Sequence, residues 1–274
     1  MTVDARRRAV MAGLGAVALA AVGQGTGRAA PSAGLAPGAP RAAAGPRPPE
    51  AWMGTVIRRI PTTRRIMALT FNAAWDESGL DTVLTELRRR KLAATFFPTG
   101  QFAEQHPGAV RAMAAAHGLG NHSHTHPYFK DLSTTERHRE VRRADAAIRE
   151  AAGTEPLPLF RFPYSSTTAD SVADVNDLGY AVVEYTQDTN GYLGPQGGMS
   201  VDKAVRRAVD AFKPGAVLQM HVGSTGDGIV LDAEALPRII DAALAEDYEI
   251  TDLRHLLVPA TPARAFTPHT RFTS

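Results

Sequence analysis

The chain has 274 residues, of which 44% are hydrophobic and 21% charged, an ordinary composition for a globular protein. Its formal net charge is only +2, and arginines alternate with acidic residues over residues 137–145, which argues against a nucleic-acid-binding protein. The absence of cysteine excludes disulfides and cysteine-ligated zinc.

The N-terminal segment is typical of an export signal. Arginines at residues 6–8 precede an apolar run at residues 9–22, which is shorter than the roughly 20 residues that a membrane-spanning helix needs. Arginines directly before a weakly hydrophobic run indicate a twin-arginine signal. We therefore expect a signal peptide over residues 1–29, no stable membrane span after its cleavage, and a secreted or cell-wall-associated protein. An uncleaved N-terminal anchor is the alternative.

The rest of the chain divides into three segments. Residues 30–54 are rich in Pro, Ala and Gly without a periodic apolar face, which predicts a disordered linker. Residues 259–274 have the character of a loose C-terminal tail. Residues 55–258 lie between them and have the size of one domain.

Residues 55–258 alternate between short apolar runs and amphipathic helical stretches. In chain order, the predicted elements are a strand at 65–71, a helix at 80–91, a strand at 93–97, a helix at 108–117, a short element at 119–120, a helix between Ser133 and Gly153, a strand at 159–162, a helix at 168–178, a strand at 180–185, a helix at 201–212, a strand at 216–220, a helix at 236–244, a strand at 248–251 and a turn at 253–257. Ser133 opens a capping box with Glu136, and Gly153 is a typical helix end. Alternating strands and helices indicate parallel strands, and the lack of a Gly-rich phosphate loop favours a barrel over an open nucleotide-binding sheet.

Polar residues follow the predicted strands where each one ends. They are Asn72 and Asp76, His122 and His126, Arg161 and Tyr164, Asp188, and His221. Because the C-terminal strand ends of a parallel barrel carry its active site, we expect these side chains to converge.

Two of these residues are candidate metal ligands. His122 and His126 stand four apart in the segment GNHSHTHP at residues 120–127, and imidazole is the commonest protein ligand of transition metals. On a strand, His124 would share their face, but Pro127 and the preceding Asn-Gly favour a loop or a first helical turn. We therefore place His124 behind the ligands or at the surface. A polar loop without a metal is the alternative.

His221 ends an apolar strand, which places its imidazole well for acid–base chemistry near neutral pH. Asp188 is the natural carboxylate to orient His221 and keep it protonated. Arg161 is suited to hold a carboxylate in a bidentate pair. The alternatives are a structural histidine and a surface salt bridge of little energetic value.

Residues 55–258 resemble a polysaccharide deacetylase of the NodB-homology type, carbohydrate esterase family four. Five motifs of that family occur in order: TFNAAW at 70–75, HSHTH at 122–126, RFPYS at 161–165, DTNGY at 188–192 and LQMH at 218–221. The second and fifth motifs are the most specific. The resemblance implies an α/β fold, a deformed (β/α)7 TIM-like barrel, that uses a divalent metal to remove acetyl groups from N-acetylated sugars.

The resemblance also implies roles for individual residues. His122 and His126 would bind the metal, His221 would be the general acid, Asp188 would tune it, and Arg161 would position the base.

Further residues would contact the substrate. The backbone near Tyr164 would help to hold the oxyanion, and Tyr192 and Leu218 would line the acetyl pocket. Candidate rings for stacking on sugar faces, each with core packing as the alternative, are Trp75, Tyr128, Phe129 and Tyr192.

The first motif departs from the family pattern. The family's base aspartate falls on Asn72 and its metal-binding aspartate on Ala73. Alanine offers no ligand, and an amide is too weak a base to take a proton from water. Three interpretations follow: Asp76 or Glu77 replaces the lost acid, Asn72 binds the metal through its carbonyl oxygen with Asp76 as the base, or the protein only binds glycan.

We favour a secreted, metal-dependent amidase that hydrolyses N-acetyl groups of N-acetylglucosamine-containing cell-wall or chitin-like glycan, with Asp76 as base and His221 as acid. The alternatives are an inactive glycan-binding protein on the same barrel and an acetyl-xylan-type esterase. Zinc is the expected metal, and cobalt or nickel also suit two imidazoles with oxygen ligands. We expect a polysaccharide or peptidoglycan substrate, no nucleic-acid partner, and a monomer.

Overall fold

The computed structural model describes residues 47–224 and 228–257. The predicted signal peptide, most of the predicted linker and the C-terminal tail lie outside these residues. The described part of the chain contains no helix that is both long and apolar enough to cross a bilayer. The predicted disorder is wrong for the last linker residues, because Glu50–Trp52 form a 3-10 helix, η1, and the N–H of Gly54 donates to Oδ1 of Asn176 at 2.6 Å.

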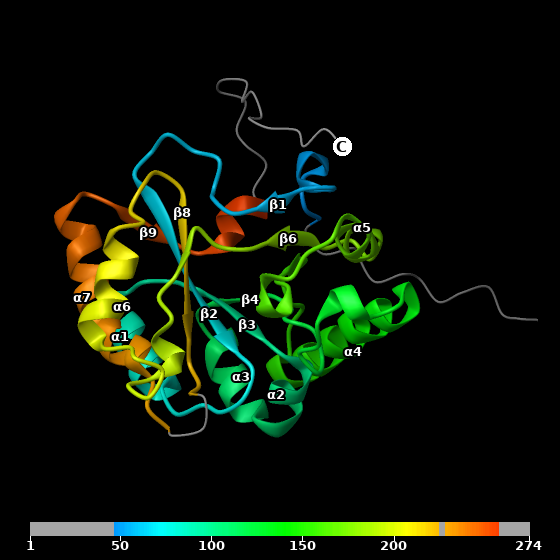
Figure 1. The fold of residues 1–274 in the computed structure, drawn as a ribbon, viewed down its shortest axis with the longest axis horizontal. Helices are drawn as coiled ribbons and strands as arrows, with labels where there is room; N and C mark the ends of the chain where they lie inside the picture. Colours follow the sequence, from blue (N-terminus) through cyan, green and yellow to red (C-terminus); the bar gives the residue numbers. More distant parts are fainter. Residues whose placement is uncertain (1–46, 225–227, 258–274) are drawn as a thin grey trace, which may run out of the picture. The chain divides into compact units, whose positions relative to one another are not determined.

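The described chain alternates strands and helices, as predicted (Figure 1). The strands are β1 (Val56–Ile57), β2 (Ile66–Ala73), β3 (Thr95–Pro98), β4 (Gly118–Leu119), β5 (Leu159–Phe160), β6 (Ala181–Val183), β7 (Gln187–Asp188), β8 (Ala216–His221) and β9 (Glu249–Thr251). The α-helices are α1 (Leu80–Arg90), α2 (Gly100–Gln105), α3 (Pro107–Ala114), α4 (Thr134–Ala152), α5 (Ala169–Asp177), α6 (Val201–Val209) and α7 (Leu231–Ala245). Further 3-10 helices are η2 (Phe129–Asp131), η3 (Pro163–Ser165), η4 (Gly191–Leu193) and η5 (Leu253–Leu257).

The strands form two parallel sheets that are joined into a deformed barrel. One has the order β4-β3-β2-β8-β7, with β9 also paired to β2, and the other has the order β1-β6-β5. Single bridges connect them, Asn121 with Phe160 and Arg59 with Ala216. Helices cover the outside of the strands: α7 packs against α1 and α6, and α4 packs against α2 and α3 (Figure 1). The predicted α/β class and parallel barrel are confirmed.

Side-chain alternation along β2 and β8 separates the outer core from the barrel interior. On β2, Met67 and Leu69 belong to a large apolar cluster with residues of α1 and α7, whereas Ile66 and Ala68 belong to an inner cluster with Val217 of β8. Because alternate residues share a face, the inner face of β2 continues with Thr70 and Asn72. The barrel interior is therefore apolar near the N-terminal strand ends and polar near the C-terminal ends.

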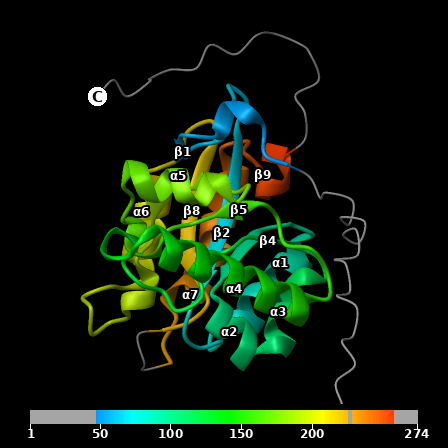
Figure 2. The same ribbon diagram turned by 90° about the vertical axis from the view of Figure 1, so that its right-hand side faces the viewer.

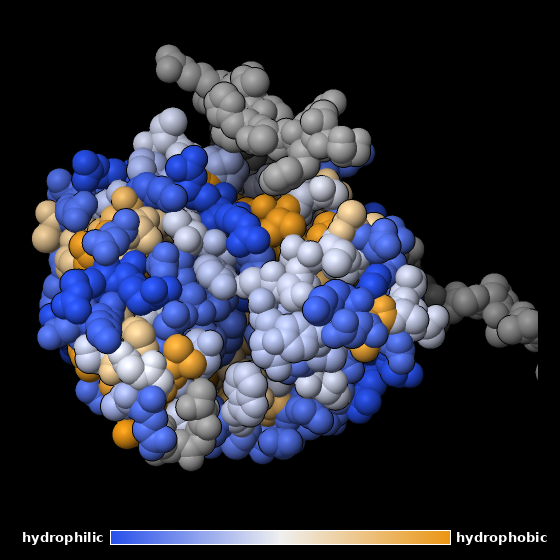
Figure 3. Space-filling view, in the orientation of Figure 1, coloured by the Kyte–Doolittle hydropathy of each residue, from blue (hydrophilic) through white to orange (hydrophobic). Residues whose placement is uncertain are grey.

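Local signals predicted several helices well. Helix α4 begins with the predicted capping box, in which Ser133 and Glu136 exchange hydrogen bonds, and Gly153 follows it with a φ of 68°. Helix α7 begins at Leu231, earlier than predicted, and contains Pro237. Helix α2 and the two-residue strands β1 and β7 were not predicted, because they are too short to show a periodic pattern. The surface of the view in Figure 3 is mainly hydrophilic, with apolar residues in small scattered groups.

Candidate active site

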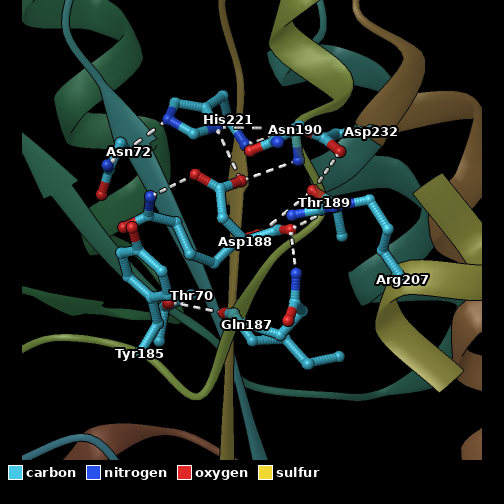
Figure 4. A network of polar contacts seen from close by, with 12 residues as sticks. Thr70, Asn72, Tyr185, Gln187, Asp188, Thr189, Asn190, Arg207, His221 and Asp232 are labelled. Carbon is cyan, nitrogen blue, oxygen red and sulfur yellow. Dashed lines mark hydrogen bonds and ion pairs between the residues drawn. The ribbon is translucent and has the colours of Figure 1, made fainter. Parts of the chain in front are cut away.

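The register of the central strands brings the first polar pair together. Asn72 of β2 is aligned with His221 of β8, and both lie at the C-terminal ends of their strands. The Nδ2 atom of Asn72 is 3.5 Å from Nε2 of His221 (Figure 4). Asn72 is therefore the side chain that the acid candidate His221 faces across the rim of the barrel.

Arg161 lies directly behind this pair, immediately after β5, and its side chain is completely buried. Its NH1 group donates to Oγ1 of Thr70 at 3.0 Å and to Oδ1 of Asn72 at 3.1 Å, and its Nε donates to the carbonyl of Val183. Burial lowers the pKa of Arg161 to about 10, so the guanidinium still carries its charge at neutral pH. The buried guanidinium of Arg161 therefore contacts the amide of Asn72, at the position where the family has its base aspartate.

His122 and His126 lie on the loop that follows β4, not on a helix. Ser123 and His126 have positive φ angles of 66° and 61°, which turn the loop sharply. Nδ1 of His122 is 2.9 Å from the carbonyl of Arg161 and must donate there, since a carbonyl only accepts. Nε2 of His122 then keeps its lone pair and lies 3.2 Å from Nε2 of His126. The two predicted ligands are brought together.

Both imidazoles are uncharged at neutral pH. Burial, then the nearby charge of His126, lowers the pKa of His122 well below 6.5. Burial, then the charge of His221, lowers the pKa of His126 to about 4. Neutral imidazole is the form that binds a metal.

The remaining donors do not complete a catalytic metal site. Catalytic zinc typically has three protein ligands, and residues 47–224 and 228–257 contain no group of three or more His, Cys, Asp or Glu side chains that could hold an ion. Ala73, where the family has its acidic ligand, is fully buried. Oδ1 of Asn72, the third predicted ligand, accepts a hydrogen bond from Arg161. The side chains present therefore supply two imidazole ligands, fewer than the three protein ligands that a catalytic metal needs.

The predicted substitute base, Asp76, is engaged elsewhere. Oδ1 of Asp76 accepts the N–H of Ser78 at 2.9 Å, and Oδ2 accepts the N–H and the hydroxyl of Ser224, both at 3.1 Å. Burial acts to raise the pKa of Asp76, but these hydrogen bonds outweigh it and lower the pKa below 3.8. Asp76 therefore fastens the loop after β2 to the segment after β8. The other predicted substitute, Glu77, is half exposed, and its Oε1 lies 3.5 Å from Nδ1 of His106.

His221 is flanked by two carboxylates. Its Nδ1 is 4.0 Å from Oδ1 of the predicted partner Asp188 and 3.7 Å from Oδ2 of Asp232 (Figure 4). Asp188 itself accepts hydrogen bonds from Nε2 of Gln219 and from the N–H of Asn190.

The sequence analysis missed Asp232, which lies in the first turn of α7 and is completely buried. Oδ2 of Asp232 accepts the backbone N–H of His221 at 2.9 Å, and Oδ1 accepts the hydroxyl of Thr189 at 2.5 Å. Acidic residues favour the first turn of a helix, and this was the available signal. The predicted helix at 236–244 began after Asp232, so the signal was not used.

Aromatic rings surround the histidine pair. Trp75 and Tyr164, both 53% exposed, each contact the ring of His126, with centroid distances of 4.8 and 4.6 Å. Tyr128 stacks on Tyr164 at 4.0 Å. The ring of Tyr192 is 4.2 Å from that of His221. These rings therefore give the site a partly apolar, solvent-accessible border.

Three other predicted residues do not lie in this border. Phe129 is fully buried and packs against Phe160. Leu218 belongs to the outer core cluster, on the face of β8 opposite to His221, so its side chain is directed away from the predicted acetyl pocket. His124, which was predicted to lie behind the ligands or at the surface, is only 1% exposed, so the surface alternative is excluded.

A parallel barrel with histidine, arginine and aspartate side chains at its C-terminal strand ends has the architecture of a barrel enzyme. The polysaccharide deacetylase family model matches residues 59–183. The chain is 31% identical over 207 residues to the chitooligosaccharide deacetylase of Bradyrhizobium sp. (strain ANU 289), which covers 75% of this chain and 88% of that protein. This chain belongs to the polysaccharide deacetylase family, whose named relatives hydrolyse amide bonds.

Two further likenesses bear on activity. The chain is 25% identical over 181 residues to the peptidoglycan-N-acetylglucosamine deacetylase of Bacillus cereus, with 66% of this chain and 64% of that protein covered. It is 26% identical to a CE4 family pseudoenzyme from Bacillus anthracis, with a TM-score of 0.67 over 75% of this chain and 69% of that one. A mutant of that pseudoenzyme is described as having restored enzymatic activity, and matches with the same identity and TM-score over 72% of its chain.

Proposed function

We propose that this chain is a secreted protein that binds N-acetylglucosamine-containing cell-wall glycan in the site of a polysaccharide deacetylase, and that its hydrolytic machinery is incomplete. One observation carries this proposal: Asn72 and Ala73 stand at the family's two acidic positions. The predicted substitute, Asp76, does not compensate, because both of its carboxylate oxygens accept hydrogen bonds from Ser78 and Ser224.

Glycan binding is supported by the border of the site. Trp75, Tyr128 and Tyr164 are exposed aromatic rings next to His126, and such rings pack well against the apolar faces of pyranose sugars. The neutral imidazoles and the amide of Asn72 offer hydrogen-bond partners for an N-acetyl group. A neutral sugar chain needs no charged groups to be held in this way.

The rival proposal is an active, metal-dependent deacetylase, and the assembly of His221, Asp188 and Arg161 in one place favours it. In that case a zinc, cobalt or nickel ion held by the histidine pair would supply electrophilic activation of the acetyl group. His221 would give a proton to the leaving amine, and Asp188 would orient the imidazole. The proton of the attacking water would have to pass to Asp76.

Calorimetric titration with chitin tetramer and with soluble peptidoglycan fragments tests binding. Stacking predicts that Trp75→Ala and Tyr164→Ala each weaken binding by about three- to tenfold. Leu244→Ala is the matched control, because Leu244 is an exposed apolar side chain on α7. Equal affinity of all these variants, or no binding by the wild type, would refute the proposed site.

Acetate release from the same ligands and from acetylated xylan decides between the two candidates. Intact binding without acetate release from any substrate supports the incomplete site. Release from chitin tetramer that depends on added metal and disappears in His221→Ala and Asp76→Asn would establish the deacetylase instead. Release from xylan alone would indicate an esterase.

A further inference from the structure

Helix α4 (Thr134–Ala152) has one face in the core and one in solvent. Residues such as Val141, Ala144 and Ile148 are buried. The opposite side borders a shallow hollow of about 430 Å³, which is lined by Thr135, His138, Arg139, Arg142 and Arg143. These five residues, the arginine face, recur at the spacing of successive helical turns and so lie side by side. Helix α4 crosses the front of the molecule in the view of Figure 2.

The three arginines of this face lack the ion-pair partners that several other arginines have in the described part of the chain. Arginines on several other elements have a carboxylate within 4.0 Å, for instance Arg64, Arg90 and Arg238. In the described part of the chain, Arg139, Arg142 and Arg143 form no such ion pair.

Two neighbours complete the electrostatics of this face. The adjacent acid, Glu136, is already held by Ser133 in the capping box, and Arg139 contributes only a weaker lowering of its pKa. Nε2 of His138 is buried and has no hydrogen-bond partner within the described residues. The arginine face therefore presents positive charge that no ion pair within the described residues neutralises.

The arginine face lies beside the histidine loop. On the core side of the same helix, Glu140 accepts hydrogen bonds from the backbone N–H groups of His124 and Thr125 at 2.9 and 2.7 Å. Arg143 stands three residues after Glu140 on α4, so this end of the arginine face adjoins the side of the helix that holds the loop. A polymer whose sugar occupies the site at His126 thus has α4 as its neighbour.

We propose that the arginine face binds the carboxylates of stem peptides carried by a peptidoglycan strand whose sugars lie in the candidate site. This inference rests on the proposed glycan-binding function and names its ligand. Guanidinium groups match carboxylates in bidentate geometry, and Arg139, Arg142 and Arg143 are spaced to receive several of them. A chitin chain is neutral and has no group for this face, so the arginine face would select peptidoglycan over chitin.

The test compares two triple variants with equal loss of charge. Arg139→Gln/Arg142→Gln/Arg143→Gln removes the face, and Arg88→Gln/Arg111→Gln/Arg206→Gln removes exposed arginines on α1, α3 and α6. The probes are soluble peptidoglycan fragments with stem peptides, the same glycan after enzymatic removal of the peptides, and chitin tetramer. Affinities are measured by calorimetry, and circular dichroism checks that each variant folds.

We expect the first variant to bind peptide-bearing fragments about tenfold more weakly, since three exposed ion pairs of ordinary strength add to that factor. Its affinity for peptide-free glycan and for chitin tetramer should match the wild type, and the control variant should match on every probe. High salt should remove the difference, because exposed charges are screened.

Unchanged binding of peptide-bearing fragments by the first variant would overturn this inference, as would an equal loss on peptide-free glycan. A greater arginine-dependent affinity for teichoic-acid phosphates or for anionic lipid vesicles would also overturn the choice of stem peptides. If the wild type fails to bind chitin tetramer and peptide-free glycan but binds peptide-bearing fragments through these arginines, the arginine face stands and the proposed sugar site fails.

Discussion

The sharpest prediction concerns the two family positions that lack an acid. Asn72→Asp places a carboxylate where Arg161 already donates a hydrogen bond at 3.1 Å and where Nε2 of His221 lies 3.5 Å away. Ala73→Asp adds an acid at the buried end of β2, beside Pro98 of β3. The carbonyl of Pro98 accepts the N–H of His122, so residue 73 and the histidine loop meet at the same rim. The double variant therefore supplies a base at position 72. Because Ala73 packs in the outer apolar cluster, it supplies a third ligand at position 73 only once the end of β2 turns that side chain toward the histidine loop.

The magnitude follows from what each group contributes. A positioned general base typically accelerates a reaction by about 10²- to 10⁴-fold, so acetate release by Asn72→Asp/Ala73→Asp with zinc should exceed that of the wild type by about this factor. Without metal, the buried carboxylate at position 73 has no partner, which should cost about 1–3 kcal/mol of unfolding free energy. Zinc should restore that loss, because an ion that binds only the folded state stabilises it.

Acetate release from chitin tetramer and thermal unfolding, each with zinc and with chelator, are the two assays. The matched control is Asn72→Asp/Ala74→Asp, which adds the same charge one residue further along, outside the position of the family ligand. Similar turnover of both double variants, or an unfolding curve of Asn72→Asp/Ala73→Asp that zinc does not shift, would refute the reasoning that the acids alone are missing.

Three further predictions address the surroundings of the site. Asp232→Ala should lower the unfolding free energy by about 2–4 kcal/mol, because two buried donors, one on His221 and one on Thr189, lose their acceptor. Urea titration measures this loss. A smaller loss in Asp232→Ala than in Thr189→Ala would contradict the prediction. Burial raises the pKa of Glu184, so the wild type should lose stability relative to Glu184→Gln as the pH rises from 4.5, and urea titrations that run parallel over that range would count against it. His126 has a pKa of about 4 when folded against 6.5 as the ordinary value, so stability should be full above pH 6.5 and fall toward pH 4, less steeply in His126→Gln; an equally steep fall in that variant would exclude His126 as the cause.

The sequence predicts well those features that depend on local chemistry. The capping box of Ser133 and Glu136 and the glycine after α4 set the bounds of that helix almost to the residue. The apolar run of β8 likewise ends at His221. Because parallel strands end at a common rim, these local predictions also place Asn72, Arg161 and His221 together.

The residues that the sequence analysis placed poorly depend on long-range contacts. Asp232 reaches His221 only because the chain returns after β8 and enters α7, a path that no periodic pattern reveals. The engagement of Asp76 also needs Ser224, which is far away in the sequence. The hydrogen bond from the N–H of Ser78 to Asp76 could have been predicted locally. An aspartate in a turn often accepts the backbone N–H of the second residue after it.

The two candidate functions differ in charge and not in fold. Arg161 is fully buried, and its guanidinium contacts an uncharged amide where a carboxylate would form the stronger charge-assisted hydrogen bond. The barrel thus bears the cost of burying that cation without the ion pair that usually offsets it. An enzyme needs a charge at position 72, whereas a glycan-binding site needs only the shape and hydrogen-bonding groups that Asn72 also provides. Turnover should therefore require acids at both positions 72 and 73, whereas glycan binding should barely respond to either.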